Sequence, residues 1–306
     1  MPKIFVEKSI YIDKSPSEVF PLINDFSVWP TWSPWLITEK GVKVNVRDDK
    51  KFYEWSGDLV GSGNMMIIDE KENDFIDCDL QFIKPFKSKA KTSMYVKAEG
   101  NGTLLRWTMN SSLPFFMFFF KKMMQNLIGL DYERGLKMIK DLAETGEINS
   151  TLEFNENQTF EGGKYIYLTN NCQFKDMADT HKADFTSLME FARSKNIIAG
   201  VGFTIYDKWD MKNLITHYKA CVLVSDIPSD LPAGFSAAEF PKIKSYTCTH
   251  TGPYRHIGNA WSGIQMRLRA KKFKHNKKVS PIEVYLNSPL DTAEKALKTV
   301  IHFATV

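Results

Sequence analysis

The sequence predicts an α+β protein of two domains. In the first half, several strand-like segments separated by turn residues lead into one long amphipathic segment, at about residues 116–144. The second half contains an internal repeat of strand, helix, strand and strand. The chain has 306 residues, a length typical of two ordinary domains.

The first domain is expected to begin with a strand over residues 4–13 and a short helix over 15–26. Ser15 and Glu18 have the spacing of a capping box, in which each side chain satisfies a free backbone N–H of the first turn. Pro16 suits the first helical position because its missing N–H has no partner there.

Antiparallel strands and one long helix are expected to complete the first domain. The strands fall between residues 51 and 112, and "EGNG" at 99–102 predicts a hairpin turn between two of them. The following helix places apolar residues on one stripe with spacings of three and four. The stripe consists of Met124, Ile128, Tyr132, Leu136, Ile139 and Ala143.

Two aromatic segments of the first domain have two interpretations each. The loop "SVWPTWSPWL" at 27–36 carries Trp29, Trp32 and Trp35, which either pin the loop to the core or border a pocket. The run "FFMFFF" at 115–120 is expected to enter the core at the start of the long helix. The alternative is that it meets another surface, such as the second domain, a partner or a membrane.

The polar segment 144–151 predicts the domain boundary, because a glycine follows the long helix there. We therefore expect domains at residues 1–148 and 149–306.

The repeat in the second half aligns two helices and the strands that follow them. Tyr206 and Tyr285 are equivalent in the alignment and 79 residues apart. Two such units related by a pseudo-twofold axis would leave a cleft between them. The two helical stripes are His181, Phe185, Leu188 and Ala192, and Ile257, Trp261, Ile264 and Leu268.

The strand "PIEVYLNSP" at 281–289 raises the question of function. Strand side chains alternate, so Glu283 and Tyr285 are expected on the face opposite Ile282, Val284 and Leu286. A solvated outer face would explain the acid, and so would the floor of an aromatic pocket.

Composition excludes several function classes. The net charge of +4 is too small to imply a nucleic-acid partner, and the four cysteines lack the spacing of disulfides or a zinc site. The longest membrane-like apolar segment, from Leu113 to Phe120, is far shorter than the roughly 20 residues of a spanning helix. The N-terminus carries charges among its apolar residues, unlike a signal peptide. We expect a cytoplasmic protein without membrane, nucleic acid, metal or cofactor.

Residues 1–148 resemble the START/polyketide-cyclase (SRPBCC) superfamily, on the segments "SPSEVFPLINDFSVWPTWSPW" and "DYERGLKMIKDLAE". The resemblance implies a helix-grip domain, in which a curved antiparallel sheet surrounds a long C-terminal helix and an apolar cavity. In such folds the tryptophan loop borders the pocket mouth.

Residues 153–306 resemble the GyrI-like, AraC-type effector-binding domain, on "THTGPYRHIGNAW" at 249–261 and "PIEVYLNSPLDT" at 281–292. The resemblance implies a ligand cleft between the two repeat units, with Glu283 as the pocket glutamate. Members include binding proteins, transcription-factor modules and hydrolases. Here no helix-turn-helix precedes the domain, which disfavours direct regulation of transcription.

These observations predict a small-molecule protein that binds or senses hydrophobic or cationic aromatic compounds. The first alternative is a hydrolase or cyclase with Glu283 as general base, and the second is a regulator acting through a partner. A solvated face or core packing remains the simpler alternative for each candidate. The expected ligand-binding residues are Glu283, Tyr285, Tyr206, Tyr254, Trp261, Trp209, Trp32 and Trp35.

Overall fold

The structure, a computed structural model, describes residues 3–306 and divides into two compact units with the boundary between Asn149 and Ser150. Each unit contains one antiparallel sheet with helices, so the protein is an α+β protein. Within residues 3–306, no helix is both long enough and apolar enough to cross a bilayer.

The first domain contains a seven-stranded sheet in the order β1-β7-β6-β5-β4-β3-β2. Glu99 pairs with Gly102, so the hairpin turn expected at 99–102 joins β6 to β7. The strands are β1 (Lys3–Ile12), β2 (Lys43–Val46), β3 (Phe52–Ser56), β4 (Ser62–Lys71), β5 (Phe75–Lys84), β6 (Ser88–Glu99) and β7 (Gly102–Ser112).

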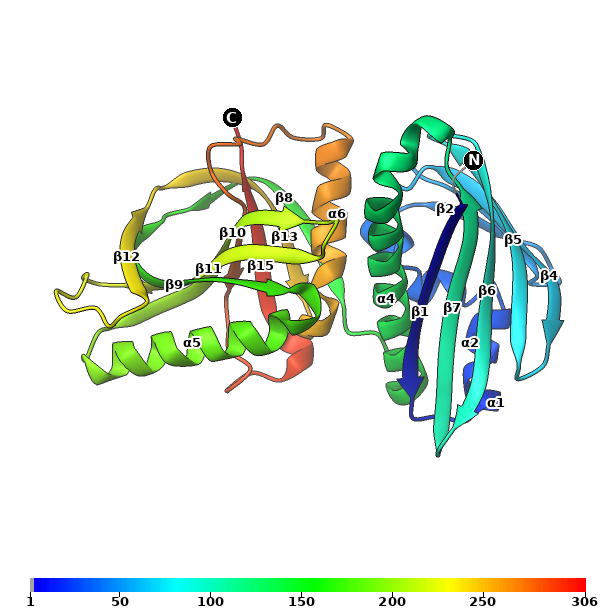
Figure 1. Cartoon of the computed structure of the whole chain (residues 1–306), viewed down its shortest axis with the longest axis horizontal. Coiled ribbons are helices and arrows are strands. Elements are labelled where there is room, and N and C mark those ends of the chain that lie inside the picture. The colour runs from blue at the N-terminus through cyan, green and yellow to red at the C-terminus, as the bar shows by residue number, and fades with distance from the viewer. Residues whose placement is uncertain (1–2) are drawn as a thin grey trace. The chain divides into compact units, whose positions relative to one another are not determined.

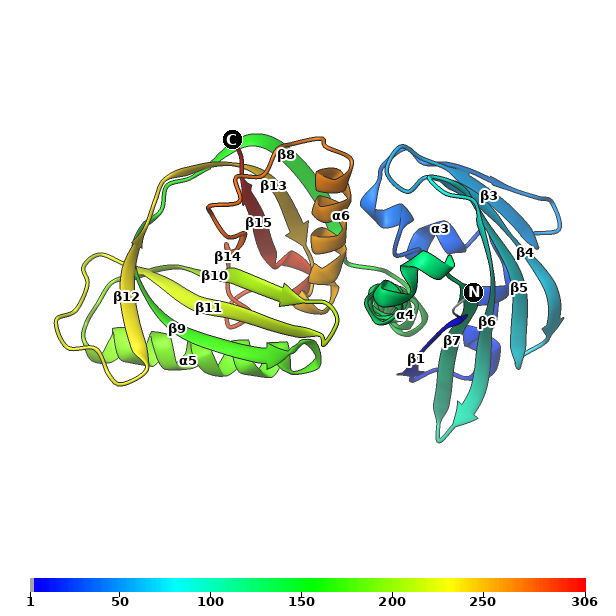
Figure 2. The same ribbon diagram turned by 45° about the horizontal axis from the view of Figure 1, so that its top comes forward.

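The long helix α4 (Lys121–Thr145) lies along one face of this sheet (Figures 1 and 2). Its apolar stripe is buried as expected at Tyr132, Leu136 and Ile139. The Tyr132 ring stacks on Trp107 of β7 with the ring centroids 3.9 Å apart. These contacts are consistent with the helix-grip arrangement.

The segment between β1 and β2 contains only short helical turns. The expected helix 15–26 is broken at Pro21 into two turns, and the Ser15 N–H donates to Glu18 Oε2 as expected of the capping box. The turns are α1 (Pro16–Val19), α2 (Pro21–Asn24), α3 (Trp29–Trp32) and η1 (Leu36–Thr38).

The expectation that residues 115–120 enter the core as the start of the long helix is wrong. They form a separate 3-10 turn, η2 (Phe115–Phe120), and α4 begins only at Lys121. All five phenylalanines of η2 are exposed. The side chains that hold this segment to the core are Leu113 and Met117.

The second domain contains an eight-stranded antiparallel sheet in the order β12-β9-β11-β10-β14-β15-β13-β8. The strands are β8 (Thr151–Phe160), β9 (Gly163–Gln173), β10 (Ala199–Asp210), β11 (Ile215–Val224), β12 (Phe235–Phe240), β13 (Ile243–Thr251), β14 (Ile282–Tyr285) and β15 (Lys298–Ala304). The helices are α5 (Met177–Ser194) and α6 (Ile257–Arg269), with the 3-10 turns η3 (Phe174–Asp176), η4 (Tyr254–His256) and η5 (Glu294–Ala296).

The sheet order is symmetric when β9–α5–β10–β11 is matched with β13–α6–β14–β15. The helix α5 packs on β9 and β11, and α6 packs on β13 and β15. The two matched halves join through β10 and β14, where Thr204 pairs with Glu283.

Both faces of this sheet are covered. One face holds an apolar cluster that includes Phe203, Ile282 and Val284. The sheet curves over this cluster (Figure 2), so that Phe160 of β8 and Phe240 of β12, from opposite edges of the sheet, have ring centroids 5.6 Å apart. The other face packs against α5 and α6.

Gly135→Ala should destabilise the first domain by about 1–3 kcal/mol, because a Cβ at this position on α4 would lie 2.8 Å from Trp107 Cζ3 and 3.2 Å from Pro34 Cδ. Gly129→Ala on the same helix is the matched control. Its Cβ would approach closely only the flexible end of Lys8, at 3.0 Å, with Val6 Cγ1 at an ordinary contact distance of 3.9 Å. The higher helix propensity of alanine should therefore leave this variant neutral or more stable by up to about 1 kcal/mol.

Urea unfolding of both variants measures the difference. Equal free energies of unfolding for the two variants would show that α4 does not pack tightly on Trp107.

Candidate functional site

The candidate site is centred on the Glu283 carboxylate, which lies on the helix-covered face of the second-domain sheet. The residue is only 5% exposed. The indole N–H of Trp261, on α6, donates to Oε2 over 2.6 Å, and the Tyr285 hydroxyl donates to Oε1 over 2.8 Å. The solvated-strand interpretation of Glu283 therefore does not hold.

Glu283 has no cationic partner within residues 3–306, because both of its hydrogen-bond donors are neutral. Burial raises the pKa of Glu283 above its ordinary value of 4.5, and the two hydrogen bonds oppose this shift only in part. A buried carboxylate without a counter-ion is costly, and proteins normally pair such a charge.

Aromatic rings surround the carboxylate. Tyr285 makes edge contacts with Tyr254 of η4, at 5.8 Å between centroids, and with Phe185 of α5, at 5.3 Å. Trp261 makes an equivalent edge contact with Tyr206 of β10, at 5.1 Å. His181 of α5 makes an edge contact with Tyr206, at 6.1 Å between centroids. We call Glu283 and these five rings, together with Trp209 and His181, the Glu283 cluster.

A β-bulge brings Trp209 into this cluster. Alternation would place Tyr206 and Trp209 on opposite faces of β10. The register of β10 against β11 shifts between Tyr206 and Lys208, and the extra residue resets the alternation. The Trp209 ring consequently stacks on Tyr206 with centroids 4.6 Å apart and lies 5.3 Å from Trp261.

Three polar atoms extend the cluster beyond the carboxylate. The Tyr285 hydroxyl lies 3.0 Å from Thr204 Oγ1 and so connects Glu283 to the opposite strand. The Tyr206 hydroxyl and His181 Nε2 are buried and make no hydrogen bond within the described residues. Burial lowers the pKa of His181 to about 4, so this ring is neutral at physiological pH.

The structure brings together six of the eight residues proposed from the sequence. It also adds Phe185 and His181, which the ligand-binding prediction did not include. Phe185 precedes Trp261 by 76 residues, the offset of the two helical stripes, so the repeat contained the signal. The six residues are Glu283, Tyr285, Tyr206, Tyr254, Trp261 and Trp209.

The other two candidates lie in the first domain, apart from this cluster. Trp32 is fully buried, and its indole N–H donates to the carbonyl of Leu22. Trp35 is half-buried over α4 and donates to Asp131. Their contacts are those of a loop pinned to the core, and a ligand-binding role for them stays a prediction.

One expected position on β14 is wrong. The strand ends at Tyr285, so Leu286 does not continue the apolar face of Ile282 and Val284 and is 53% exposed.

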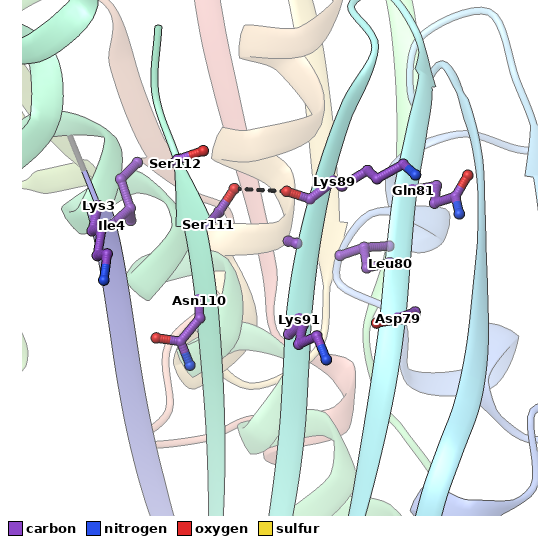
Figure 3. Close-up of a pocket in the computed structure, with 11 residues that line it drawn as sticks. Lys3, Ile4, Asp79, Leu80, Gln81, Lys89, Lys91, Asn110, Ser111 and Ser112 are labelled. Atoms are coloured by element: carbon purple, nitrogen blue, oxygen red, sulfur yellow. Dashed lines mark hydrogen bonds between the residues drawn. The ribbon is translucent and has the colours of Figure 1, made fainter. Parts of the chain in front are cut away.

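A shallow hollow of about 550 Å³ lies in the first domain where β1, β5, β6 and β7 adjoin (Figure 3). Most of its rim is polar or charged and exposed. It lacks the convergent buried polar groups of the Glu283 cluster and is not our candidate site. Its lining residues include Lys3, Ile4, Asp79, Leu80, Lys89 and Asn110.

Comparison with known proteins identifies the first domain by sequence. Residues 3–144 match the family described as polyketide cyclase / dehydrase and lipid transport. No curated protein matches the chain.

Several solved structures are similar to parts of the chain. The EcmrR C-terminal domain is 16% identical and has a TM-score of 0.43, with 52% of this chain and 99% of that chain covered. The match falls on the second half of this chain. MLL2253 from Mesorhizobium loti is 12% identical, with a TM-score of 0.36 and coverage of 45% and 95%. The Aha1 dimer from Colwellia psychrerythraea is 13% identical, with a TM-score of 0.35 and coverage of 47% and 99%.

Glu283→Gln should change how the stability of the second domain depends on pH. A carboxyl whose pKa is raised by folding binds its proton more tightly in the folded state, so the wild type loses stability as the pH rises above 4.5. The loss ends once the pH exceeds the folded pKa, and each pH unit between the unfolded and the folded pKa costs about 1.4 kcal/mol. The variant lacks this loss, so the difference in free energy of unfolding should grow over that range in its favour.

Urea unfolding at a series of pH values measures this difference, with hydrogen exchange of the β14 backbone as the signal for unfolding of the second domain. Glu239→Gln, at an exposed position on β12, should run parallel to the wild type. Parallel curves for Glu283→Gln as well would contradict the raised pKa.

Proposed function

Since residues 3–144 form a domain of the polyketide cyclase / dehydrase and lipid transport family, we propose that this two-domain protein binds a small hydrophobic ligand. We further propose that the ligand carries a positive charge on or beside an aromatic group and that the second domain holds it at the Glu283 cluster.

The observation that carries this proposal is the buried Glu283 carboxylate, which has neutral donors only and lies in a cluster of aromatic rings. A ligand cation would supply the counter-ion that the protein lacks. Aromatic rings attract the same cation through their negative faces and shield the ion pair from water. An anionic ligand would meet an uncompensated carboxylate, and a neutral one would leave it unpaired.

The two halves of the second domain support this assignment. We interpret them as duplicated units related by a pseudo-twofold axis, which passes between the paired Thr204 and Glu283. Tyr206 and Tyr285 are then equivalent, and so are the ring contacts of Trp261 with Tyr206 and of Phe185 with Tyr285. Only one copy carries an acid on the axis.

Access to the carboxylate runs through the aromatic rings. Glu283 is buried, whereas Tyr254, Trp209 and Trp261 are partly exposed. We propose that a ligand reaches Glu283 by rotating one of these rings and then stacks against it. The unbonded Tyr206 hydroxyl and His181 Nε2 would provide a donor and a neutral ring nitrogen for polar groups of the ligand.

The first domain offers less support for a ligand of its own. Trp107 and Tyr132 stack in the space between the sheet and α4, and Trp35 packs edge-on against both rings. The apolar cavity expected there stays a prediction.

A hydrolase acting on the same class of compound is the second candidate. The observation that favours it is the hydroxyl of Tyr285, which connects Glu283 to Thr204. A carboxylate with a raised pKa, held in place by this hydroxyl, can accept a proton from the water that attacks the substrate and then pass the same proton to the leaving group. Mass spectrometry of candidate compounds after incubation with the protein would detect such turnover.

Glu283→Gln should lower the affinity for benzyltrimethylammonium by about thirtyfold, since an ion–aromatic site of this kind contributes about 2 kcal/mol. Neopentylbenzene has the same shape without the charge, and its affinity should change little. Isothermal titration calorimetry on the full chain measures both.

Glu239→Gln removes an equal charge from the domain surface and should leave both affinities unchanged. Equal losses for the charged and the neutral probe would show that the substitution acts through the fold. An unchanged affinity for a compound that the wild type converts, with turnover lost only in Glu283→Gln, would favour the hydrolase.

A further inference from the structure

The first domain displays a cluster of exposed phenylalanines that the proposed function does not use. Four of these side chains are at least three-quarters exposed: Phe86 at 80%, Phe115 at 76%, Phe116 at 75% and Phe119 at 76%. Exposed aromatic side chains in such number mark a contact surface, because they are costly in water. We call η2 together with the β5–β6 turn, residues 85–87, the phenylalanine end of the domain.

Both parts of this end leave the sheet at the same place. Ala90 of β6 pairs with Ser111 of β7, and the Ser111 hydroxyl donates to the carbonyl of Lys89, as Figure 3 shows. The β5–β6 turn ends three residues before Ala90, and η2 begins four residues after Ser111. Lys3, at the start of β1, pairs with Ser112 and so lies at this end too.

The phenylalanines are held outward by a fixed backbone. Leu113 is buried, and Met117 packs against the domain core, so η2 is anchored on one side. All five phenylalanines of η2 are exposed, and a 3-10 turn distributes its side chains around the axis. Phe118 contacts Phe119, with ring centroids 3.7 Å apart, and the segment presents protruding rings on several sides.

The charges that neighbour these rings along the chain are all basic. The adjoining β3–β4 loop, where Ser62 pairs with Lys84, carries the acid Asp58. From Leu80 to Ala98 the chain has five lysines and no acidic residue. From Thr103 to Leu130 it has three basic residues and again no acid. Lys87 and Lys89 follow Phe86, and Lys121 follows Phe120 directly. Asp79, which lines the adjacent hollow, is the nearest acid along β5.

From this arrangement we propose that the phenylalanine end docks the protein on the surface of an anionic lipid bilayer. Phenylalanine rings insert at the boundary between headgroups and acyl chains, and lysines beside them contact anionic headgroups. A fluid bilayer accommodates protruding rings, whereas a protein partner needs a matching rigid surface. This contact is peripheral, and it departs from the expectation of no membrane partner drawn from the sequence.

Sedimentation of the full chain with vesicles tests the proposal. We expect binding to vesicles that contain phosphatidylserine and much weaker binding to vesicles of phosphatidylcholine alone. Phe115→Ser/Phe116→Ser/Phe119→Ser should reduce the partition coefficient at least about tenfold. Lys87→Gln/Lys89→Gln/Lys121→Gln should reduce it by about tenfold or more on the anionic vesicles and little on the neutral ones.

The matched control is Ile198→Ser/Leu290→Ser, which removes apolar side chains that are 77% and 96% exposed in the second domain. It should bind vesicles as the wild type does. Thermal melting of all variants checks that the fold is kept, which the exposure of every substituted side chain leads us to expect.

Three outcomes would overturn the proposal. The wild type could fail to sediment with anionic vesicles. The control could lose as much binding as the phenylalanine variant. The phenylalanine variant could convert a dimer to a monomer in light scattering without changing vesicle binding, which would make this surface an interface between copies of the chain.

Discussion

The second domain depends on the pairing of β10 with β14, because this ladder is the only one that joins its two matched halves within the described sheet. Four residue pairs form it, from Gly202 with Tyr285 to Ile205 with Ile282. A shift by one residue would turn Glu283 toward the apolar cluster of Phe203 and Val284 and expose that cluster's residues to the helices. The register that closes the core thus also fixes the carboxylate among the aromatic rings.

The two domains treat their buried aromatic residues differently. In the first domain the indole N–H groups of the buried tryptophans have internal partners: Trp29 donates to the carbonyl of Ile23, Trp32 to that of Leu22 and Trp107 to Thr92 Oγ1. In the second domain the Tyr206 hydroxyl and His181 Nε2 have none within residues 3–306. Satisfied polar atoms are typical of a core, and each unsatisfied one needs an explanation, which the proposed ligand would supply for these two atoms.

Much of this arrangement could be predicted from the sequence. The stripe of α4, the hairpin at 99–102 and the equivalence of Tyr206 with Tyr285 all follow from periodicity or repetition, which local residue patterns encode. Glu283 and Trp261 could be named as candidates, but their hydrogen bond could not. The bulge that admits Trp209 depends on how β10 meets β11, and no local pattern announces it. The outward turn of Phe115–Phe120 contradicts its composition, because burial of an apolar run is the more common outcome.

The position of Glu283 between two otherwise similar halves also gives the cluster a direction. On the α6 side the carboxylate meets an indole donor, whereas on the α5 side the matching helical position holds Phe185, which offers only shape. If the proposed ligand binds here, one with its charge at one end would bind in one orientation, and a symmetric dication would find a counter-ion for only one of its two charges. Substitutions on α5 would change the size of the uncharged part of the ligand that fits, and substitutions on α6 would change recognition of its charged group. Selectivity for size and selectivity for charge could therefore change independently.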